Sequence, residues 1–321
     1  MLGVQRNIPV IAVVGPTASG KTALAARLAL YFGGEVISAD SIQIYDGMDI
    51  ATAKPALDEM LGVPHYMIGF LPPQCEYSVA EYTMLAAKII RHINRRNKVS
   101  IIAGGTGLYI DSLLNNIKFS EVSPDFKLRS KLRNTAQEKG NGYLHHILQQ
   151  CDRDAAEKIS ENDVLRIIRA IEAYKLSGKT AAQREIESKA SPAEYSTFYI
   201  GLDFHDRQRL YDRINTRVDA MVKAGLVDEA KFFLSSSISK TAMNAIGYKE
   251  LMPFVAGESK LDECIEKIKM DTRRYAKRQL TWFRRNKSVN WIDVQDKSAA
   301  EIFDEAKKLI ESSSLFKLMH P

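Results

Sequence analysis

The eight residues from Gly15 to Thr22, GPTASGKT, have the types and the spacing that bind a phosphate chain. They match the pattern G-x-x-x-x-G-K-[ST], in which backbone N–H groups converge on phosphate oxygens, the lysine adds a positive charge and the last hydroxyl binds Mg²⁺. We therefore expect Lys21 to supply that charge and Thr22 to be the magnesium ligand. The pattern leaves open which phosphate compound is bound and whether a phosphate is transferred. The expected phosphate-binding residues are Gly15, Pro16, Thr17, Ala18, Ser19, Gly20, Lys21 and Thr22.

A carboxylate, Asp40, follows the next apolar segment, residues 35–39. In a doubly wound sheet the carboxyl ends of the strands face the ligand crevice, so we expect Asp40 near the phosphate loop. There it could act as a general base or as an indirect magnesium ligand. The alternative is an aspartate that only caps a turn or a helix. Ser41, Gln43 and Tyr45 then alternate along the chain and offer hydrogen-bonding and stacking groups.

A third apolar run ends in glycine and threonine, in the segment IIAGGTGLY at residues 101–109. A P-loop ATPase usually places an acidic residue at the end of such a strand, to hold Mg²⁺ and handle water. Here Gly104 and Gly105 would let the backbone approach a ligand closely, and Thr106 supplies a neutral hydroxyl. A tight strand-to-helix turn is the alternative. The missing carboxylate disfavours nucleotide hydrolysis.

Basic residues gather late in the chain, where nine lysines and arginines lie between residues 267 and 287 against one acid, Asp271. Tyr275, Trp282 and Phe283 are interleaved with them. This pattern fits binding of a phosphate backbone, and equally a solvated helix face whose aromatic residues turn to the core. A second basic pair, one helical turn apart, could point into one anion site or remain at the surface. The pair consists of Arg213 and Arg217.

The elements that must position these residues alternate between strands and helices. Residues 8–14 and 99–103 are apolar runs typical of strands buried on both faces of a sheet, and 35–39 form a shorter one. Residues 23–32 have a helical pattern, and Ser78-x-x-Glu81 is a capping box that opens a helix ending near residue 96. This alternation predicts an α/β fold, a P-loop-type core built on a doubly wound parallel sheet.

The pattern changes between residues 117 and 198, where charged helical segments are punctuated by glycine and no convincing strand is found. We therefore predict an all-helical insertion at 117–198, between a first part of the core at 1–116 and a second part at 199–321. The second part should hold a strand at 198–204, helices over 207–234 and 261–285, a short strand at 289–294 and a final helix.

The composition fits a globular protein, with 45% apolar and 26% charged residues and a net charge of +6 that permits a nucleic-acid partner. The sequence contains no run of eighteen or more apolar residues, so it predicts no membrane-spanning helix. The first apolar stretch ends in the phosphate loop instead of a signal-peptide cleavage site. The three cysteines are scattered, which argues against disulfides or a zinc site. We expect a cytoplasmic protein that does not bind a membrane.

Together these motifs resemble the tRNA dimethylallyltransferase family, also called tRNA isopentenyltransferases. The similarity spans nearly the whole chain in the family's order, and the family's eukaryotic zinc finger is not found, so the bacterial members are the better match. Two positions differ from the family pattern, Ala51 in place of glycine and Gly69 in place of an aspartate. The matching segments are GPTASGKT, DSIQIYDGMDIATAKP from Asp40, GGTGLY from Gly104, NDVLRIIRAIE from Asn162, SGKT from Ser177, AIGYKEL from Ala245 and AKRQLTWFRR from Ala276.

The resemblance implies a specific reaction and partners. A dimethylallyl group would pass from dimethylallyl diphosphate to N6 of the adenosine just 3′ of the anticodon, with Mg²⁺ as cofactor and the helical insertion gripping the anticodon stem-loop. Asp40 would be the general base, Thr106 and Arg217 would be catalytic residues on the diphosphate side, and the enzyme would act as a monomer. The implied tRNA-binding residues are Asp40, Ser41, Ile42, Gln43, Thr106, Arg129, Leu165, Arg166, Ile167, Ile168, Arg169, Asn244, Ala245, Ile246, Gly247, Tyr248 and Lys249.

Two other functions fit part of the pattern. A P-loop kinase of a nucleoside or small metabolite would share the loop, the fold and an acidic residue after the second strand. An RNA-binding switch would use the loop only to sense a nucleotide, and such a protein should work without Asp40. Consumption of labelled ATP or of labelled prenyl diphosphate separates the kinase from the transferase.

Overall fold

The chain folds into two compact units. The first consists of Met1–Leu114 together with Glu194–Pro321, and the second of Asn115–Ala193. The structure is a computed structural model that describes residues 7–115, 125–189 and 194–319. Within these residues no helix is both long enough and apolar enough to cross a membrane.

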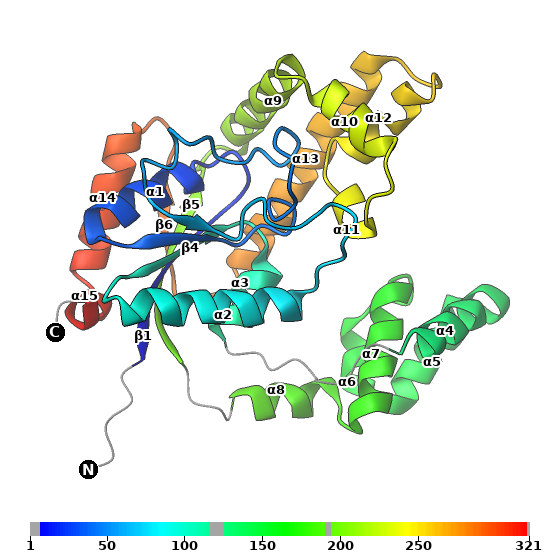
Figure 1. Cartoon of the computed structure of the whole chain (residues 1–321). Coiled ribbons are helices and arrows are strands. Elements are labelled where there is room, and N and C mark those ends of the chain that lie inside the picture. The colour runs from blue at the N-terminus through cyan, green and yellow to red at the C-terminus, as the bar shows by residue number, and fades with distance from the viewer. Residues whose placement is uncertain (1–6, 116–124, 190–193, 320–321) are drawn as a thin grey trace, which may run out of the picture. The chain divides into compact units, whose positions relative to one another are not determined.

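A six-stranded parallel sheet forms the centre of the first unit, as far as the chain is described (Figure 1). The strand order is β3-β2-β4-β1-β5-β6, so β1 lies between β4 and β5. The predicted α/β fold with a parallel sheet is therefore confirmed. The strands are β1 (Ile8–Val14), β2 (Glu35–Ser38), β3 (His65–Tyr66), β4 (Ser100–Gly104), β5 (Tyr195–Asp203) and β6 (Val289–Asp293).

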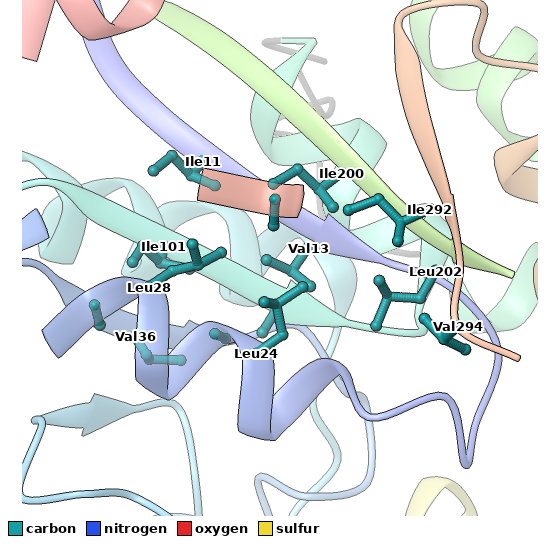
Figure 2. Packing of buried hydrophobic residues seen from close by; sticks show 14 of the residues in the cluster. Ile11, Val13, Leu24, Leu28, Val36, Ile101, Ile200, Leu202, Ile292 and Val294 are labelled. Atoms are coloured by element: carbon teal, nitrogen blue, oxygen red, sulfur yellow. The ribbon is translucent and has the colours of Figure 1, made fainter. Parts of the chain in front are cut away.

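Both faces of the sheet are buried, because successive side chains of a strand point to opposite sides. In β1, Ile11 and Val13 join one hydrophobic cluster, while Val10, Ala12 and Val14 join another. The first cluster packs under α1 (Lys21–Phe32), α14 (Ala299–Glu311) and α15 (Ser314–Met319), and Figure 2 shows its side chains. The second packs under α2 (Val79–Arg95) and α3 (Gly107–Leu114).

Local signals set both ends of α1 and the start of α2. Helix α1 begins directly after Gly20, whose φ of 90° is left-handed, and it ends at Gly33 with φ 63°. Helix α2 opens on the predicted capping box, in which the Ser78 hydroxyl accepts from the Glu81 amide and the Glu81 carboxylate accepts from the Ser78 amide. Both signals are short-range, so the sequence alone predicts these ends.

A third hydrophobic cluster lies beyond the sheet in the same unit. It joins the loop around Ile44 and Met48 to five helices, and α13 passes from this cluster at Ile268 to the sheet clusters at Ala276 and Phe283. Side chains in the middle of α13 are therefore held against the phosphate loop. The helices are α9 (Arg207–Lys223), α10 (Leu226–Leu234), α11 (Lys240–Met243), α12 (Tyr248–Val255) and α13 (Leu261–Phe283).

In the described part of the second unit, residues 125–189, all regular secondary structure is helical. It has its own core, which includes Leu144, Leu148, Ile167 and Ile171, all of them fully buried. The helices are α4 (Phe126–Lys139), α5 (Asn141–Cys151), α6 (Arg153–Lys158), α7 (Val164–Ser177) and α8 (Ala181–Lys189).

Two strands differ from the sequence prediction. Strand β5 begins at Tyr195 and not at 198, because its first residues continue the pairing with β1 down to Ile8. A boundary after residue 198 therefore falls inside this strand. The two-residue strand β3 was not predicted, since His65 and Tyr66 are too few and too polar to form a strand pattern.

Candidate active site

The phosphate loop occupies the turn between β1 and α1. Gly15 has a φ of 144°, and a Cβ there would lie 2.6 Å from the Leu202 carbonyl oxygen, so no larger residue fits. Ala18 adopts φ 63°, a left-handed conformation that is uncommon for alanine. The Nε of Arg213 donates to the Ala18 carbonyl at 3.1 Å and braces this strained position.

Lys21 lies in the concave face of the loop, where its ammonium donates to the Pro16 carbonyl at 2.6 Å. Burial and, to a lesser extent, the nearby Arg217 lower the pKa of Lys21 to about 7, although Asp40 acts in the opposite direction. Two cations held together away from water repel each other, so an anion between them would be strongly favoured. The surroundings of Lys21 thus suit a diphosphate.

Asp40 stands immediately after β2, at the carboxyl end of the sheet. Its Oδ1 accepts from the amides of Ile42 at 2.9 Å and Gln43 at 3.3 Å. Its Oδ2 has no hydrogen-bond partner among the described residues. One oxygen therefore caps the turn, as the structural alternative expects, and the other is available to a ligand.

The Gly104-Gly105-Thr106 turn after β4 lies against Asp40. A Cβ on Gly104 would overlap the Ala39 backbone, which explains the glycine. The Thr106 amide donates to the Ala39 carbonyl at 3.1 Å, and the Thr106 hydroxyl oxygen accepts from the Ser41 amide at 3.1 Å. Thr106 thus fixes the backbone on both sides of Asp40.

Helices α9 and α13 complete the site. Arg217 on α9 is half-buried; loss of solvent around its guanidinium lowers its pKa, while Asp40 and Glu59 act in the opposite direction. On α13, the Gln279 carbonyl oxygen accepts from the Thr17 amide at 2.8 Å, and its amide donates to the Gly105 carbonyl at 3.1 Å. Gln279 therefore joins the phosphate loop to the glycine turn.

Two cavities meet at these residues. The phosphate cavity has a volume of about 340 Å³ and is lined by loop residues that include Lys21 and Thr22. A neighbouring cavity of about 380 Å³ is lined by more apolar groups, such as Ile42 and Met221, together with Arg278. The residues that line both cavities are Thr17, Asp40, Thr52, Arg217 and Tyr275.

Comparison with known proteins identifies the family. Residues 43–286 match the family model described as IPP transferase. The chain belongs to this family. It is 47% identical to the tRNA dimethylallyltransferase of Acetivibrio thermocellus over 305 residues, which cover 94% of this chain and 95% of that protein. The same enzyme of Thermoanaerobacter sp. is 47% identical over 307 residues, covering 94% and 96%.

Solved structures of the family share the fold. A tRNA isopentenylpyrophosphate transferase from Bacillus halodurans superposes with a TM-score of 0.71 at 39% identity, covering 98% of this chain and all of that one (100%). A eukaryotic dimethylallyltransferase, crystallised acting on tRNA, gives a TM-score of 0.82 at 29% identity, covering 98% and 80%.

Most of the core residues that the family resemblance implies lie at the two cavities, but not all. Gly247 and Tyr248 are buried and line neither cavity. Thr106 also lines neither cavity, and its hydroxyl oxygen accepts from the Ser41 amide. Tyr45 is fully buried, so the expected stacking role is wrong for it. The residues that do line a cavity are Thr17, Ala18, Gly20, Lys21, Thr22, Asp40, Ser41, Ile42, Gln43, Arg217, Asn244, Ala245, Ile246 and Lys249.

The helical unit holds six of the tRNA-binding residues that the family resemblance implies, and they differ in exposure and pairing. Leu165, Arg166 and Arg169 are exposed on α7, and neither arginine forms an ion pair with a described residue. Ile167 and Ile168 instead fill the core of the unit, so their side chains cannot reach an RNA. A sixth residue is already paired: Arg129 forms a bidentate ion pair with Glu172.

The basic stretch at residues 267–287 has several features of a solvated helix face with an aromatic residue turned inward. Lys267, Lys269, Arg274 and Arg284 each pair with a carboxylate, as a solvated face does. Trp282 turns inward, and its indole N–H donates to Asp111 at 2.7 Å. Only part of the helix faces a cavity, through Thr272, Tyr275, Arg278 and Gln279.

Four residues that the sequence motifs do not predict also line the phosphate cavity: Gln279, Thr52, Lys54 and Glu59. Tyr275 and Gln279 are four residues apart, so they lie on one face of α13. The sequence spacing therefore indicates that the two side chains share a helix face, but it does not indicate which part of the protein that face contacts. Thr52 and Lys54 lie in an irregular loop, where side-chain direction follows no period.

The phosphate cavity has oxygen donors that fit a magnesium ion. The Thr22 hydroxyl and the carboxylates of Asp40 and Glu59 line the same cavity, and Mg²⁺ prefers such ligands. Within the described residues there is no cluster of three or more His, Cys, Asp or Glu side chains suited to a metal. Mg²⁺ commonly binds through one or two protein groups plus substrate phosphates, and these residues fit that mode.

Proposed function

We propose that this chain transfers a dimethylallyl group from dimethylallyl diphosphate to N6 of the adenosine 3′-adjacent to the anticodon of tRNA, releasing diphosphate. The observation that carries the proposal is that the phosphate cavity and the more apolar neighbouring cavity meet at Asp40 and Arg217. The diphosphate would occupy the first cavity and the adenine the second. Their reacting atoms would then meet at the shared wall.

Asp40 would accept the proton. An adenine amine is a weak nucleophile because its lone pair is delocalised into the ring. As N6 bonds to C1 of the dimethylallyl group, the C1–O bond breaks, and its electron pair leaves with the diphosphate. The N6 proton passes to Oδ2 of Asp40, the oxygen that has no protein partner among the described residues. General-base catalysis of this kind contributes about 10²–10⁴ in rate.

The leaving diphosphate gathers negative charge that the phosphate loop would stabilise. Lys21 and Arg217 are already desolvated beside the loop, so their interaction with an anion is stronger than it would be in water. Thr22, with Glu59 nearby, would hold Mg²⁺, which neutralises phosphate charge when bound. The phosphate loop would thus bind a leaving group, and no phosphoryl group would be transferred.

The exposed arginines of the helical unit support its role in tRNA binding. Arg166 and Arg169 lie on one helix face with no ion-pair partner among the described residues, as cations that contact phosphates must. The target adenine has to leave the stack to reach a cavity, and an unpaired anticodon loop makes that inexpensive. We propose that the enzyme acts in the cytoplasm as a monomer.

Substrate consumption tests the proposal. The purified protein should incorporate label from dimethylallyl diphosphate into unmodified tRNA, and EDTA should abolish incorporation. The same protein should leave labelled ATP intact in the presence of nucleosides. Transfer of the ATP γ-phosphate without any prenylated tRNA would favour the kinase instead.

A further inference from the structure

One loop forms a wall of both cavities. Ala51 and Thr52 line the neighbouring cavity, and Thr52, Ala53 and Lys54 line the phosphate cavity. The loop is not part of a helix or strand, so its shape depends on side chains that bind its backbone. Gln43 supplies one such contact, since its amide donates to the carbonyls of Thr52 at 3.3 Å and Ala53 at 3.2 Å.

A single carboxylate binds the start of this loop from the other side. Glu229 on α10 accepts from three consecutive amides, those of Asp49 at 2.9 Å, Ile50 at 2.7 Å and Ala51 at 2.9 Å. The same carboxylate accepts from the hydroxyl of Tyr248 at 2.9 Å. Both oxygens of Glu229 are therefore used, and each accepts two hydrogen bonds.

These contacts connect the two sides of the site. Tyr248 is fully buried and begins α12, and Lys249, the next residue, lines the neighbouring cavity. Lys54, at the other end of the loop, lies in the phosphate cavity, and its ammonium contacts Asp49 at 2.6 Å. Because the Asp49 amide is one of those bound by Glu229, the position of Lys54 depends on that carboxylate.

We propose that Glu229 is a positioning residue for both substrates, an inference that rests on the proposed function. It lines neither cavity, and it acts through the loop from Asp49 to Lys54. A carboxylate suits this task because bonds from N–H and O–H donors to a charged acceptor are shorter and stronger than bonds to a neutral one. Glutamine at this position would present an N–H group to amides that also donate.

Glu229→Gln tests the proposal in the full-length protein. The KM for dimethylallyl diphosphate and the KM for tRNA should both rise about 10-fold or more, since misplacing a contact by about 1 Å can cost up to about 100-fold. Calorimetry with dimethylallyl diphosphate and Mg²⁺, without tRNA, should show a matching loss of affinity. Tyr248→Phe removes one of the four bonds and should give a smaller rise in both constants. Asp228→Asn, the same change of charge on the adjacent residue of α10, should leave both unchanged.

A purely structural role would give a different pattern: a lower melting temperature and less active enzyme, with both KM values unchanged. That pattern overturns the proposal, as does an equal rise in Asp228→Asn. If Glu229→Gln does not fold, unchanged KM values in Tyr248→Phe overturn it. If the wild-type protein binds dimethylallyl diphosphate but transfers nothing, the proposed function fails, and the calorimetric comparison still tests Glu229.

Discussion

Asp40 and Arg217 line both cavities, so one carboxylate and one guanidinium form the boundary between the space for phosphates and the space beside it. The two groups interact, since Asp40 raises the pKa of Arg217 against the effect of burial. A base and a cation at the same boundary can take a proton from one side and stabilise a leaving anion on the other. This pairing distinguishes the site from one that only binds a nucleotide.

Replacing Asp40 by asparagine should reduce prenyl transfer by about 10²–10⁴. Asparagine keeps an oxygen to accept from the Ile42 and Gln43 amides, so the turn should survive. Affinity for tRNA should stay within a few-fold of the wild type, as measured by filter binding. Near-normal single-turnover rates in Asp40→Asn would remove Asp40 from the mechanism.

Gln279→Leu should raise the KM for dimethylallyl diphosphate by about 10-fold. The change leaves the Thr17 amide and the Gly105 carbonyl without their partner, so the phosphate loop loses its link to the glycine turn. Steady-state kinetics with each substrate varied in turn would measure this. Thr281→Val, a change on the same helix outside both cavities, should leave this KM unchanged, and an equal rise there would argue against the link.

Arg166→Gln or Arg169→Gln should weaken tRNA binding and reduce the slope of log K against log salt by about 1. Each arginine is exposed and has no ion-pair partner among the described residues. Binding of dimethylallyl diphosphate should not change, because the phosphate cavity is built entirely from the first unit. An unaltered salt slope in both variants would exclude these side chains from contact with phosphates.

Glu35→Gln should lower the free energy of unfolding by about 3 kcal/mol at neutral pH, since it leaves two cations beside a buried neutral group. The Glu35 side chain is fully buried and pairs with Arg96 and Lys98. These partners and Tyr66 lower its pKa from 4.5 to about 2, against the effect of burial. Ionised Glu35 therefore stabilises the fold above about pH 4.5, and the contribution is lost as the pH falls towards 2. Urea unfolding at pH 7 and pH 3 should show the difference between variant and wild type shrinking with acidity.

The sequence predicts those parts of the fold and of the site that short-range residue patterns determine. The run from Ile8 to Val14 and the glycine spacing after it predict the phosphate loop, and the structure places α1 within two residues of expectation. The spacing of Tyr275 and Gln279 places them on one face of α13, but that this face contacts the phosphate loop is a tertiary relationship with no local signal. The family resemblance implies a continuous segment that includes Ile167 and Ile168, whereas a helix exposes only one face and these two side chains lie in the core.

The most direct test is nucleoside analysis of tRNA from cells that lack this protein. N6-(dimethylallyl)adenosine, with any derivative of it, should disappear from the position 3′ of the anticodon. Expression of the wild-type chain should restore it, and expression of the Asp40→Asn chain should not. Unchanged levels of the prenylated nucleoside in the deletion strain, or full restoration by Asp40→Asn, would contradict the account.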